Sequence, residues 1–320
     1  APPASFTFPL TDAELAEIRW YFTEYPENTF GDASIRAEKV EAGLKDLGRI
    51  LYETVFGSSD ARSLLDRATG SGQAQLSIVS TRPEFLGLPW ELLNHDESGY
   101  LTTQFGSVSR RLSTESLETF SGQMPTDQLN VLLLLPPTGE GSGSIATEVL
   151  TALESLTVEA ELDCLRTSSL ANLQERLASK SGRYHLVHFD GFTVDSQGIL
   201  MEDGSGGTIS VDAAELARTL AASQTPVVLV NASLSSALDN VMSFAVELAQ
   251  EAVPQVVVTP LPIAGAGRVL FSENLFKGIS EGTPVSRTVA TIREAMMDHP
   301  QRPSATGPLV SWDWTVPIVF

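Results

Sequence analysis

The amino-acid sequence predicts an α/β protein with a mostly parallel β-sheet covered by helices on both faces, preceded by a smaller helical and hairpin domain. After about residue 130, short apolar runs rich in Val, Ile and Leu alternate with segments of helical periodicity. Such alternation is typical of parallel strands joined by helical crossovers. The chain has 320 residues, 42% of them hydrophobic, which suffices for one large or two ordinary domains.

The first 70 residues predict three helices. We expect Asp12 to be the N-cap of the first, which reaches Tyr25 and ends before Pro26. The second covers residues 32–56 and is closed by Gly57. A third, short helix is expected over residues 60–68. The apolar face predicted for the second helix consists of Ile35, Val40, Leu44, Leu47, Ile50, Leu51 and Val55.

Strands and turns are predicted between residues 75 and 127. A strand at 75–80 precedes a segment in which Pro83 and Pro89 are expected to force turns before a short helix. Residues 100–105 and 107–112 predict a β-hairpin. The polar stretch 113–127 predicts a linker, so we expect two domains, 1–125 and 126–320. Glu91 could pair with Arg110 or Arg111 and hold the first domain against the second.

The second domain predicts strands and helices in alternation. The expected strands are 130–135, 158–165, 184–190, 226–231, 255–261 and 315–320. The expected helices lie near 144–156, 169–180, 212–222, 240–252, 265–281 and 284–298. A glycine-rich stretch at 139–143 precedes the first of these helices, where a dinucleotide could bind, but its spacing and Glu140 favour a solvated loop. Residues 204–207 predict a turn.

The formal net charge of −20 and the pI of about 4.5 exclude a nucleic-acid or anionic-membrane surface, because phosphate binding needs clustered Lys and Arg. The acidity indicates either a solvated surface or a preference for basic partners. The chain has no run of eighteen apolar residues, and Cys164 is its single cysteine. The N-terminus lacks the basic and apolar regions typical of a signal peptide, so we expect none. These features favour a cytoplasmic protein without disulfides, and we expect no cofactor and no metal.

Two strand ends carry the polar residues that matter most. Residues 184–192 contain His188, Asp190 and Gly191, and residues 227–233 end in Asn231, Ala232 and Ser233. The carboxyl ends of parallel strands form the edge of an α/β sheet where ligands and catalytic groups collect. We therefore expect a groove lined by His188, Asp190, Gly191 and Asn231.

These motifs together resemble the CHAT domain, a caspase-like family in the clan of caspases, gingipains and separase, from about residue 12 to residue 320. The resemblance implies a caspase-like sheet. The motifs that carry the resemblance are, in chain order, Leu88-Pro89-Trp90-Glu91-Leu92-Leu93, Tyr184-His185-Leu186-Val187-His188-Phe189-Asp190-Gly191, Asn231-Ala232, Val253-Pro254-Gln255-Val256-Val257-Val258 and Trp314-Thr315-Val316-Pro317-Ile318.

In that family the first strand end is followed by a catalytic His-Gly and the second strand ends in Ala-Cys. Here the corresponding pairs are Phe192-Thr193 and Ala232-Ser233. A peptidase of this type needs a thiolate activated by an adjacent imidazole that also protonates the leaving amine. Phe192 can neither accept nor donate a proton, and the Ser233 hydroxyl without a base stays a neutral alcohol. The dyad is therefore expected to be degenerate at Phe192 and Ser233.

Alternatives remain open for the other residues. His188 is either a substitute base or a structural, partly buried histidine, and an extended strand would put it roughly 13 Å from position 192. His185 faces the opposite side of the sheet and is expected to be structural. Asp190 either lines a remnant specificity pocket, as acidic groups do in basic-specific relatives of this clan, or binds loop amides.

Two functions follow from the resemblance. The first is a pseudopeptidase, a caspase-type scaffold that no longer hydrolyses and binds a peptide, a protein partner or a second copy of itself, in bacterial defence or signalling. The second is a cysteine endopeptidase, active or inactivated by substitution of its Cys/His dyad. A third hypothesis is a purely structural subunit, whose groove is filled by its own loops.

Overall fold

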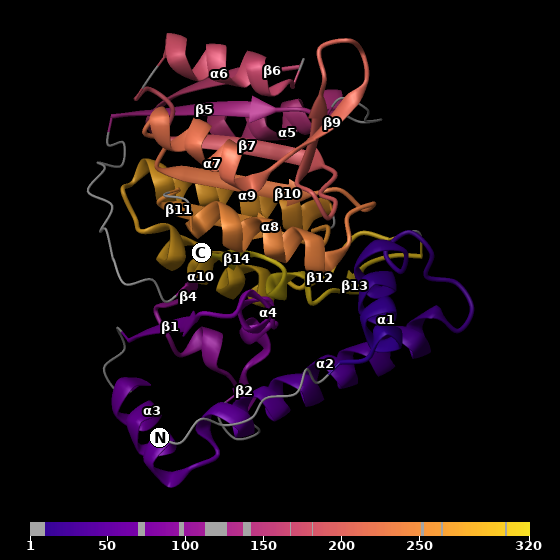
Figure 1. Cartoon of the computed structure of the whole chain (residues 1–320). Coiled ribbons are helices and arrows are strands. Elements are labelled where there is room, and N and C mark those ends of the chain that lie inside the picture. The colour runs from indigo at the N-terminus through magenta and orange to yellow at the C-terminus, as the bar shows by residue number, and fades with distance from the viewer. Residues whose placement is uncertain are drawn as a thin grey trace.

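The computed structural model describes residues 10–69, 74–95, 99–112, 127–136, 142–166, 168–180, 182–250, 253–263, 265–304 and 306–320. Its centre is a six-stranded sheet in the order β14-β11-β10-β7-β5-β6, which Figure 1 shows as a stack of arrows. All neighbours in this sheet are parallel except β14, which is antiparallel to β11. The strands are β5 (Gln128–Leu134), β6 (Glu159–Leu165), β7 (Leu186–Phe192), β10 (Val227–Ala232), β11 (Gln255–Thr259) and β14 (Ile318–Val319). The mixed α/β fold with a mainly parallel sheet is thus confirmed.

Helices cover both faces of this sheet. On one face pack α5 (Ser142–Glu154), α9 (Gly265–Ser280) and α10 (Val285–Asp298). On the other pack α6 (Leu170–Ser179), α7 (Ala213–Ala222) and α8 (Leu238–Gln250). Alternate residues of a buried strand enter the two cores, as Leu186 and Val187 of β7 do. The antiparallel pair β8 (Ile199–Glu202) and β9 (Thr208–Val211) confirms the turn predicted at 204–207.

The first part of the chain lies against the lower end of this sheet in Figure 1. It comprises α1 (Asp12–Thr23), α2 (Ala33–Phe56), α3 (Ser59–Thr69), β1 (Gln75–Ser80), α4 (Pro83–Leu86), the 3-10 helix η1 (Trp90–Leu92) and β4 (Ser107–Leu112). Its apolar residues and those of α5, α9 and α10 form one continuous core. The predicted boundary at residue 125 lies outside the described residues and stays a prediction.

The hairpin predicted at 100–112 is wrong. β4 pairs with β1 in parallel register, Gln75 opposite Ser107, and β3 (Gly99–Tyr100) pairs instead with β2 (Asn94–His95). Between β3 and β4 the chain forms the 3-10 helix η2 (Leu101–Thr103), whose Leu101 is buried. β4 therefore pairs along its length with β1 and not with the segment just before it. A parallel pairing between segments far apart in the sequence leaves no short-range sequence signal.

Two local details of the N-terminal helices also differ from expectation. Thr11, not Asp12, is the N-cap of α1: its hydroxyl accepts from Glu14 N while the Glu14 carboxylate accepts from Thr11 N, a capping box. Pro83 begins α4 rather than forcing a turn, as proline can in a first helical turn. The helix α2 packs through a stripe of residues adjacent to the predicted face. Three residues of the predicted face are therefore exposed, namely Ile35, Ile50 and Val55.

A buried ion-pair cluster joins the two parts of the chain. Arg110 of β4 makes two hydrogen bonds of 2.6 Å to the Glu91 carboxylate, as the sequence suggested. Arg293 of α10 also donates to Glu91, at 3.1 Å, and to Pro317 O. Since Arg110 lies in the first part of the chain, its pair with Glu91 does not link the two parts; Arg293 of the second part makes that link by bonding to Glu91.

Smaller elements complete the chain, namely β12 (Gln301–Arg302), β13 (Leu309–Val310) and the 3-10 helix η3 (Asp313–Thr315). Arg302 and Asp313 form a further buried pair here. The predicted linker and the glycine-rich stretch at 139–143 fall almost entirely outside the described residues. Among the described residues, the helices are all too short or too polar to cross a membrane.

Candidate functional site

The two strand ends singled out from the sequence are neighbours in the sheet. β7 and β10 run side by side, with Val230 opposite Phe189 and Asn231 opposite Asp190. The register shifts after Asn231, so that Ala232 pairs with Phe192. Ser233 N then donates to Phe192 O at 2.8 Å. The structure therefore brings the segments that carry positions 192 and 233 into direct backbone contact.

The register shift coincides with Gly191. Its φ of +76° lies in the left-handed region that residues with a Cβ rarely adopt. A Cβ at this position would also contact Pro136 at 3.7 Å. β7 nevertheless continues through Gly191 to Phe192.

Asn231 connects three strands at the sheet edge. Its Nδ2 lies 3.0 Å from His188 Nε2 and 3.3 Å from Asp190 Oδ1, and its Oδ1 accepts from Thr259 Oγ1 at 2.8 Å. Because Asn231 donates to Nε2, the imidazole carries its proton on Nδ1. Three of the predicted groove residues, His188, Asp190 and Asn231, therefore form one hydrogen-bonded group with Thr259.

His188 is buried in this network. Its exposed fraction is 1%, and its Nδ1 is a buried nitrogen without a hydrogen-bond partner among the described residues. Burial lowers its pKa, and Arg268 acts in the same direction, while Asp190, 3.7 Å away, acts to raise it. The lowered pKa keeps this buried imidazole neutral at neutral pH.

Ser233 lies in a cluster of hydroxyl groups. Its Oγ lies 2.9 Å from Thr193 Oγ1, 2.7 Å from Ser235 Oγ and 3.4 Å from Ser236 Oγ. Ser236 is itself buried and accepts from Val194 N at 2.9 Å. Every neighbour in this cluster is a neutral alcohol, which is too weak a base to take a proton from serine at neutral pH. The cluster orders the turn after β10 but offers no general base.

The four histidines of the chain all lie in described segments, and none forms a hydrogen bond with Ser233 among those residues. His185 accepts from Asn130 N through its Nδ1 at 2.9 Å. His188 bonds to Asn231, His299 contacts Ala295 O, and His95 stacks near Tyr52. Ser233 thus has no imidazole in hydrogen-bond contact.

Phe192 points into the protein core. It is fully buried with the residues under α6, α7 and α8, and its ring meets Phe189 edge-on at a centroid distance of 5.5 Å. A histidine needs a hydrogen-bond partner at such a position, whereas a phenyl ring fits without one. The structure accommodates Phe192 as a core residue.

Four polar residues to which the sequence assigns no role complete the site: Thr193, Ser235, Ser236 and Thr259. The Ser-rich turn after Ala232 was visible in the sequence, but nothing there showed which hydroxyl would face Ser233. Thr259 ends the next strand, so the rule for carboxyl edges could have found it. In the described part of the chain, no group of three or more His, Cys, Asp and Glu side chains is arranged to hold a metal ion.

A comparison with protein families gives this geometry its context. The family model described as CHAT domain matches residues 45–316, which is most of the chain. No curated protein matches the chain. The chain therefore belongs to the CHAT domain family, and its caspase-like α/β fold agrees with that membership.

Proposed function

We propose that this protein is a pseudopeptidase of the CHAT family, a caspase-type scaffold that binds a peptide or protein partner without cleaving it. The observation that supports this most is the set of partners of Ser233. Among the described residues, its side-chain hydrogen bonds go to Thr193, Ser235 and Ser236. A hydroxyl whose partners are other hydroxyls has no general base beside it to take its proton as it attacks a carbonyl carbon.

The burial of Phe192 supports the same proposal. The matching position in the family holds the catalytic histidine, and here it holds a side chain integrated in the core. His188 is an unsuitable replacement, because it is buried, hydrogen-bonded to Asn231 and depressed in pKa. The edge of the sheet itself is intact, and Asn231, Thr259 and Asp190 hold its strands in register. An ordered edge without a base suits binding rather than hydrolysis.

Family membership also supports a second candidate, a cysteine endopeptidase in which Ser233 stands where the native gene has Cys. The backbone contact between Ser233 and Phe192 favours it, since a Cys and a His at these positions would lie on adjacent strands. The two candidates differ in one measurable property, which is whether the scaffold still cleaves when the dyad is supplied.

The test uses the full chain and its Phe192→His/Ser233→Cys variant, both in a Cys164→Ser background so that Cys164 cannot react. Each is incubated with a mixture of random peptides and analysed by mass spectrometry. We expect no cleavage by the unaltered chain. Cleavage at measurable rates by that chain would refute the pseudopeptidase proposal.

The double variant separates the candidates further. If it cleaves peptides and an electrophilic cysteine probe labels Cys at position 233, the groove has kept the shape of a peptidase and the second candidate gains. If it folds, as circular dichroism would show, and neither cleaves nor reacts, the groove has diverged to a binding function. Ser233→Cys alone is the matched control, because a thiol without an imidazole should remain slow.

A further inference from the structure

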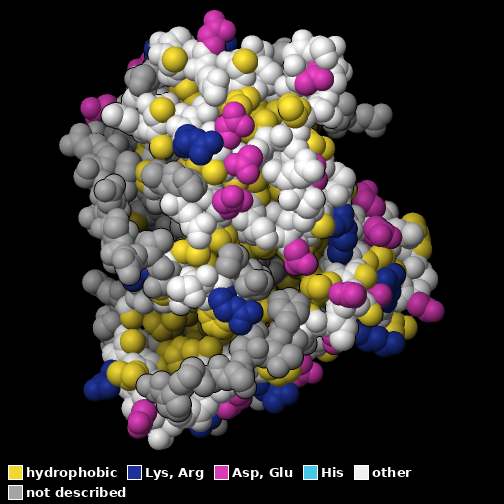
Figure 2. Space-filling model, in the orientation of Figure 1, with side chains coloured by type: hydrophobic (Ala, Val, Ile, Leu, Met, Phe, Trp, Pro, Cys, Tyr) yellow, Lys and Arg dark blue, Asp and Glu magenta, His cyan; other side chains and the backbone are white. Residues whose placement is uncertain are grey.

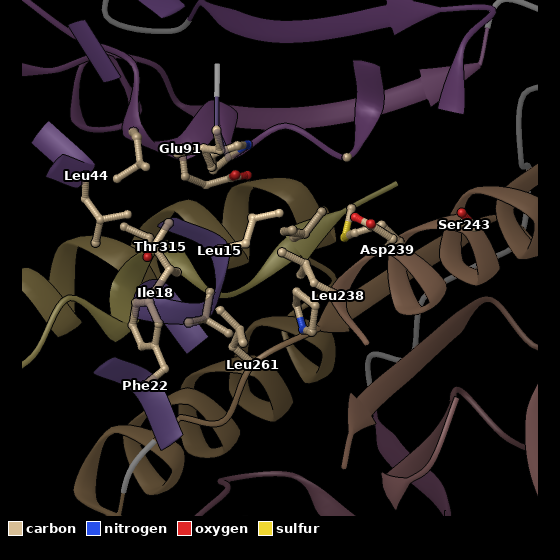
Figure 3. Close-up of a pocket in the computed structure, with 18 of the residues that line it drawn as sticks. Leu15, Ile18, Phe22, Leu44, Glu91, Leu238, Asp239, Ser243, Leu261 and Thr315 are labelled. Carbon is tan, nitrogen blue, oxygen red and sulfur yellow. The ribbon is translucent and has the colours of Figure 1, made fainter. Parts of the chain in front are cut away.

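A cavity of about 570 Å³ lies beside the turn that carries Ser233. It is bounded by α1, by the segment between α4 and η1, by the start of α8 and by the chain after β11. Figure 3 shows its side chains converging on one space from these separate elements. Cavities of this size take drug-sized molecules or a few side chains of a peptide.

The walls of this cavity are mainly apolar. The described residues that contribute apolar side chains come from six separate stretches of the chain. None of Phe192, Ser233, His188, Asp190 or Asn231 is among the described lining residues, so the cavity is distinct from the candidate site. The apolar lining residues include Leu15, Ile18 and Phe22 of α1, Leu44 of α2, Leu238 and Met242 of α8, and Leu261, Val316 and Ile318.

The charged groups of the lining are unevenly distributed. Glu91 is buried and paired with both Arg110 and Arg293, so its carboxylate is not available to an occupant. Asp12 and Asp239 are exposed carboxylates at the borders, and Arg82 is the basic residue among the described lining residues. Figure 2 shows acidic side chains spread over the face it displays, in a chain of net charge −20. The cavity therefore combines an apolar interior with an acidic border.

Hydrogen bonds and the continuous chain link the walls of the cavity to the candidate site. Arg19 lies on α1 between Ile18 and Phe22, and its Nη1 donates to Ser236 O at 2.7 Å. Ser236 in turn holds Val194 N and lies beside Ser233. Leu238 and Asp239, which line the cavity, continue directly from this turn into α8. An occupant that contacts α1 would thus be coupled, through Arg19 and Ser236, to the turn that follows β10.

We propose that this cavity is the anchor site for a large apolar residue of an extended partner peptide that carries Lys or Arg next to that residue. The proposal rests on the peptide-binding function above and names the class of peptide. Burying one large apolar side chain contributes about 1.5–3 kcal/mol, equivalent to about 10- to 100-fold in affinity. The carboxylates at the border add selectivity for positive charge and accelerate encounter more than they add affinity.

The test is a selection of random twelve-residue peptides displayed on phage against the immobilised full chain. Enriched peptides are synthesised with a fluorophore and their affinities are measured by anisotropy. We expect them to share a large apolar residue beside Lys or Arg. Leu15→Trp and Leu261→Trp, which fill the cavity from two different elements, should each weaken binding at least about tenfold. Ala16→Trp, on the exposed side of the same helix, is the matched control and should leave affinity unchanged.

Charge is tested separately. Asp239→Asn should weaken binding by about two- to fivefold and reduce its dependence on salt, as expected for a partly exposed pair. Glu281→Gln, an exposed acid away from the lining, should have no effect. Circular dichroism confirms that each variant is folded, and two filling variants guard against the loss of one.

The outcomes distinguish the two proposals. If the chain enriches no peptide, peptide binding itself is wrong, and the anchor site fails with it. If peptides are enriched and bind both filling variants as tightly as the unaltered chain, the anchor site is refuted while the binding function stands. Enrichment of peptides without basic residues, or with acidic ones, would refute the preference for positive charge.

Discussion

Arg293 and Glu91 are 202 positions apart, yet Arg293 Nη2 donates to Glu91 Oε1 at 3.1 Å with both side chains buried. Arg110 completes the cluster by binding both Glu91 oxygens. Burial acts to raise the pKa of Glu91, but Arg110 and Arg293 outweigh it and the pKa is lowered. Burial also lowers the pKa of Arg293 to about 10, which still leaves it charged at neutral pH. One carboxylate is therefore the shared partner of two buried guanidinium groups.

Replacing that carboxylate should be severely destabilising. Glu91→Gln would leave Arg110 and Arg293 buried without a counter-charge, and we expect the free energy of unfolding to fall by about 3–5 kcal/mol. Urea denaturation followed by circular dichroism measures this loss. Glu17→Gln is the control, because its pair with Arg36 is exposed and should matter much less. Similar losses in both variants would contradict the role given to the cluster.

The approach of α2 to η1 gives a second prediction. A Cβ on Gly48 would lie 1.9 Å from Leu92 O and 2.4 Å from Asn94 Nδ2, so Gly48→Ala must push the two elements apart. We expect a loss of about 1–3 kcal/mol in thermal or urea unfolding. Gly43 lies on the same helix with open space around it, and Gly43→Ala should stabilise by about 0.5–1 kcal/mol. The opposite order of stabilities would show that α2 does not pack here as described.

The buried histidines predict a dependence of stability on pH. Burial lowers the pKa of both His188 and His185 in the folded chain, whereas histidine in an unfolded chain titrates near about 6.5. Between these values the unfolded chain binds more protons, so the free energy of unfolding should fall as pH drops below about 6.5. Urea unfolding between about pH 7.5 and 5.5 tests this. His188→Gln should flatten the slope, and an unchanged slope would rule out His188 as a contributor.

The hydroxyl cluster gives a fourth prediction. Ser236→Ala would remove the acceptor of Val194 N, a buried donor, and should cost about 1–2 kcal/mol. Ser235 is exposed and its hydroxyl bonds only to other hydroxyls among the described residues, so Ser235→Ala should change stability little. Equilibrium unfolding of the two variants side by side compares them. Equal effects would mean that the Ser236 hydroxyl does not support the turn.

Much of the fold could be read from local pattern. The strands β5, β6, β7, β10 and β11 and the helices between them lie within a few residues of their predicted positions, because buried parallel strands and amphipathic helices have distinct periodicities. The pairing of β1 with β4 could not be read, since their intervening segment resembles a hairpin strand and parallel pairing is set by distant contacts. Likewise Ile50 fits the predicted face of α2 but is exposed, because the packing partner decides which stripe is covered.

The site divides in the same way. Residue types and strand ends identified Phe192, Ser233, His188, Asp190, Gly191 and Asn231 as neighbours of one sheet edge. Their roles depend on the orientation and burial of their side chains, which the amino-acid sequence does not specify directly. Only the folded chain oriented Phe192 into the core, joined His188 to Asn231 and surrounded Ser233 with hydroxyls.

The sequence by itself determined the α/β class, the order of elements in the second part of the chain and the absence of imidazole and thiol at positions 192 and 233. The tertiary structure alone decided that Arg293 reaches Glu91 and that α1 closes a cavity beside the Ser233 turn. The physical reason is range. Periodicity and turn chemistry act over a few residues, whereas ion pairs, cavities and parallel pairing arise between segments that only folding brings together.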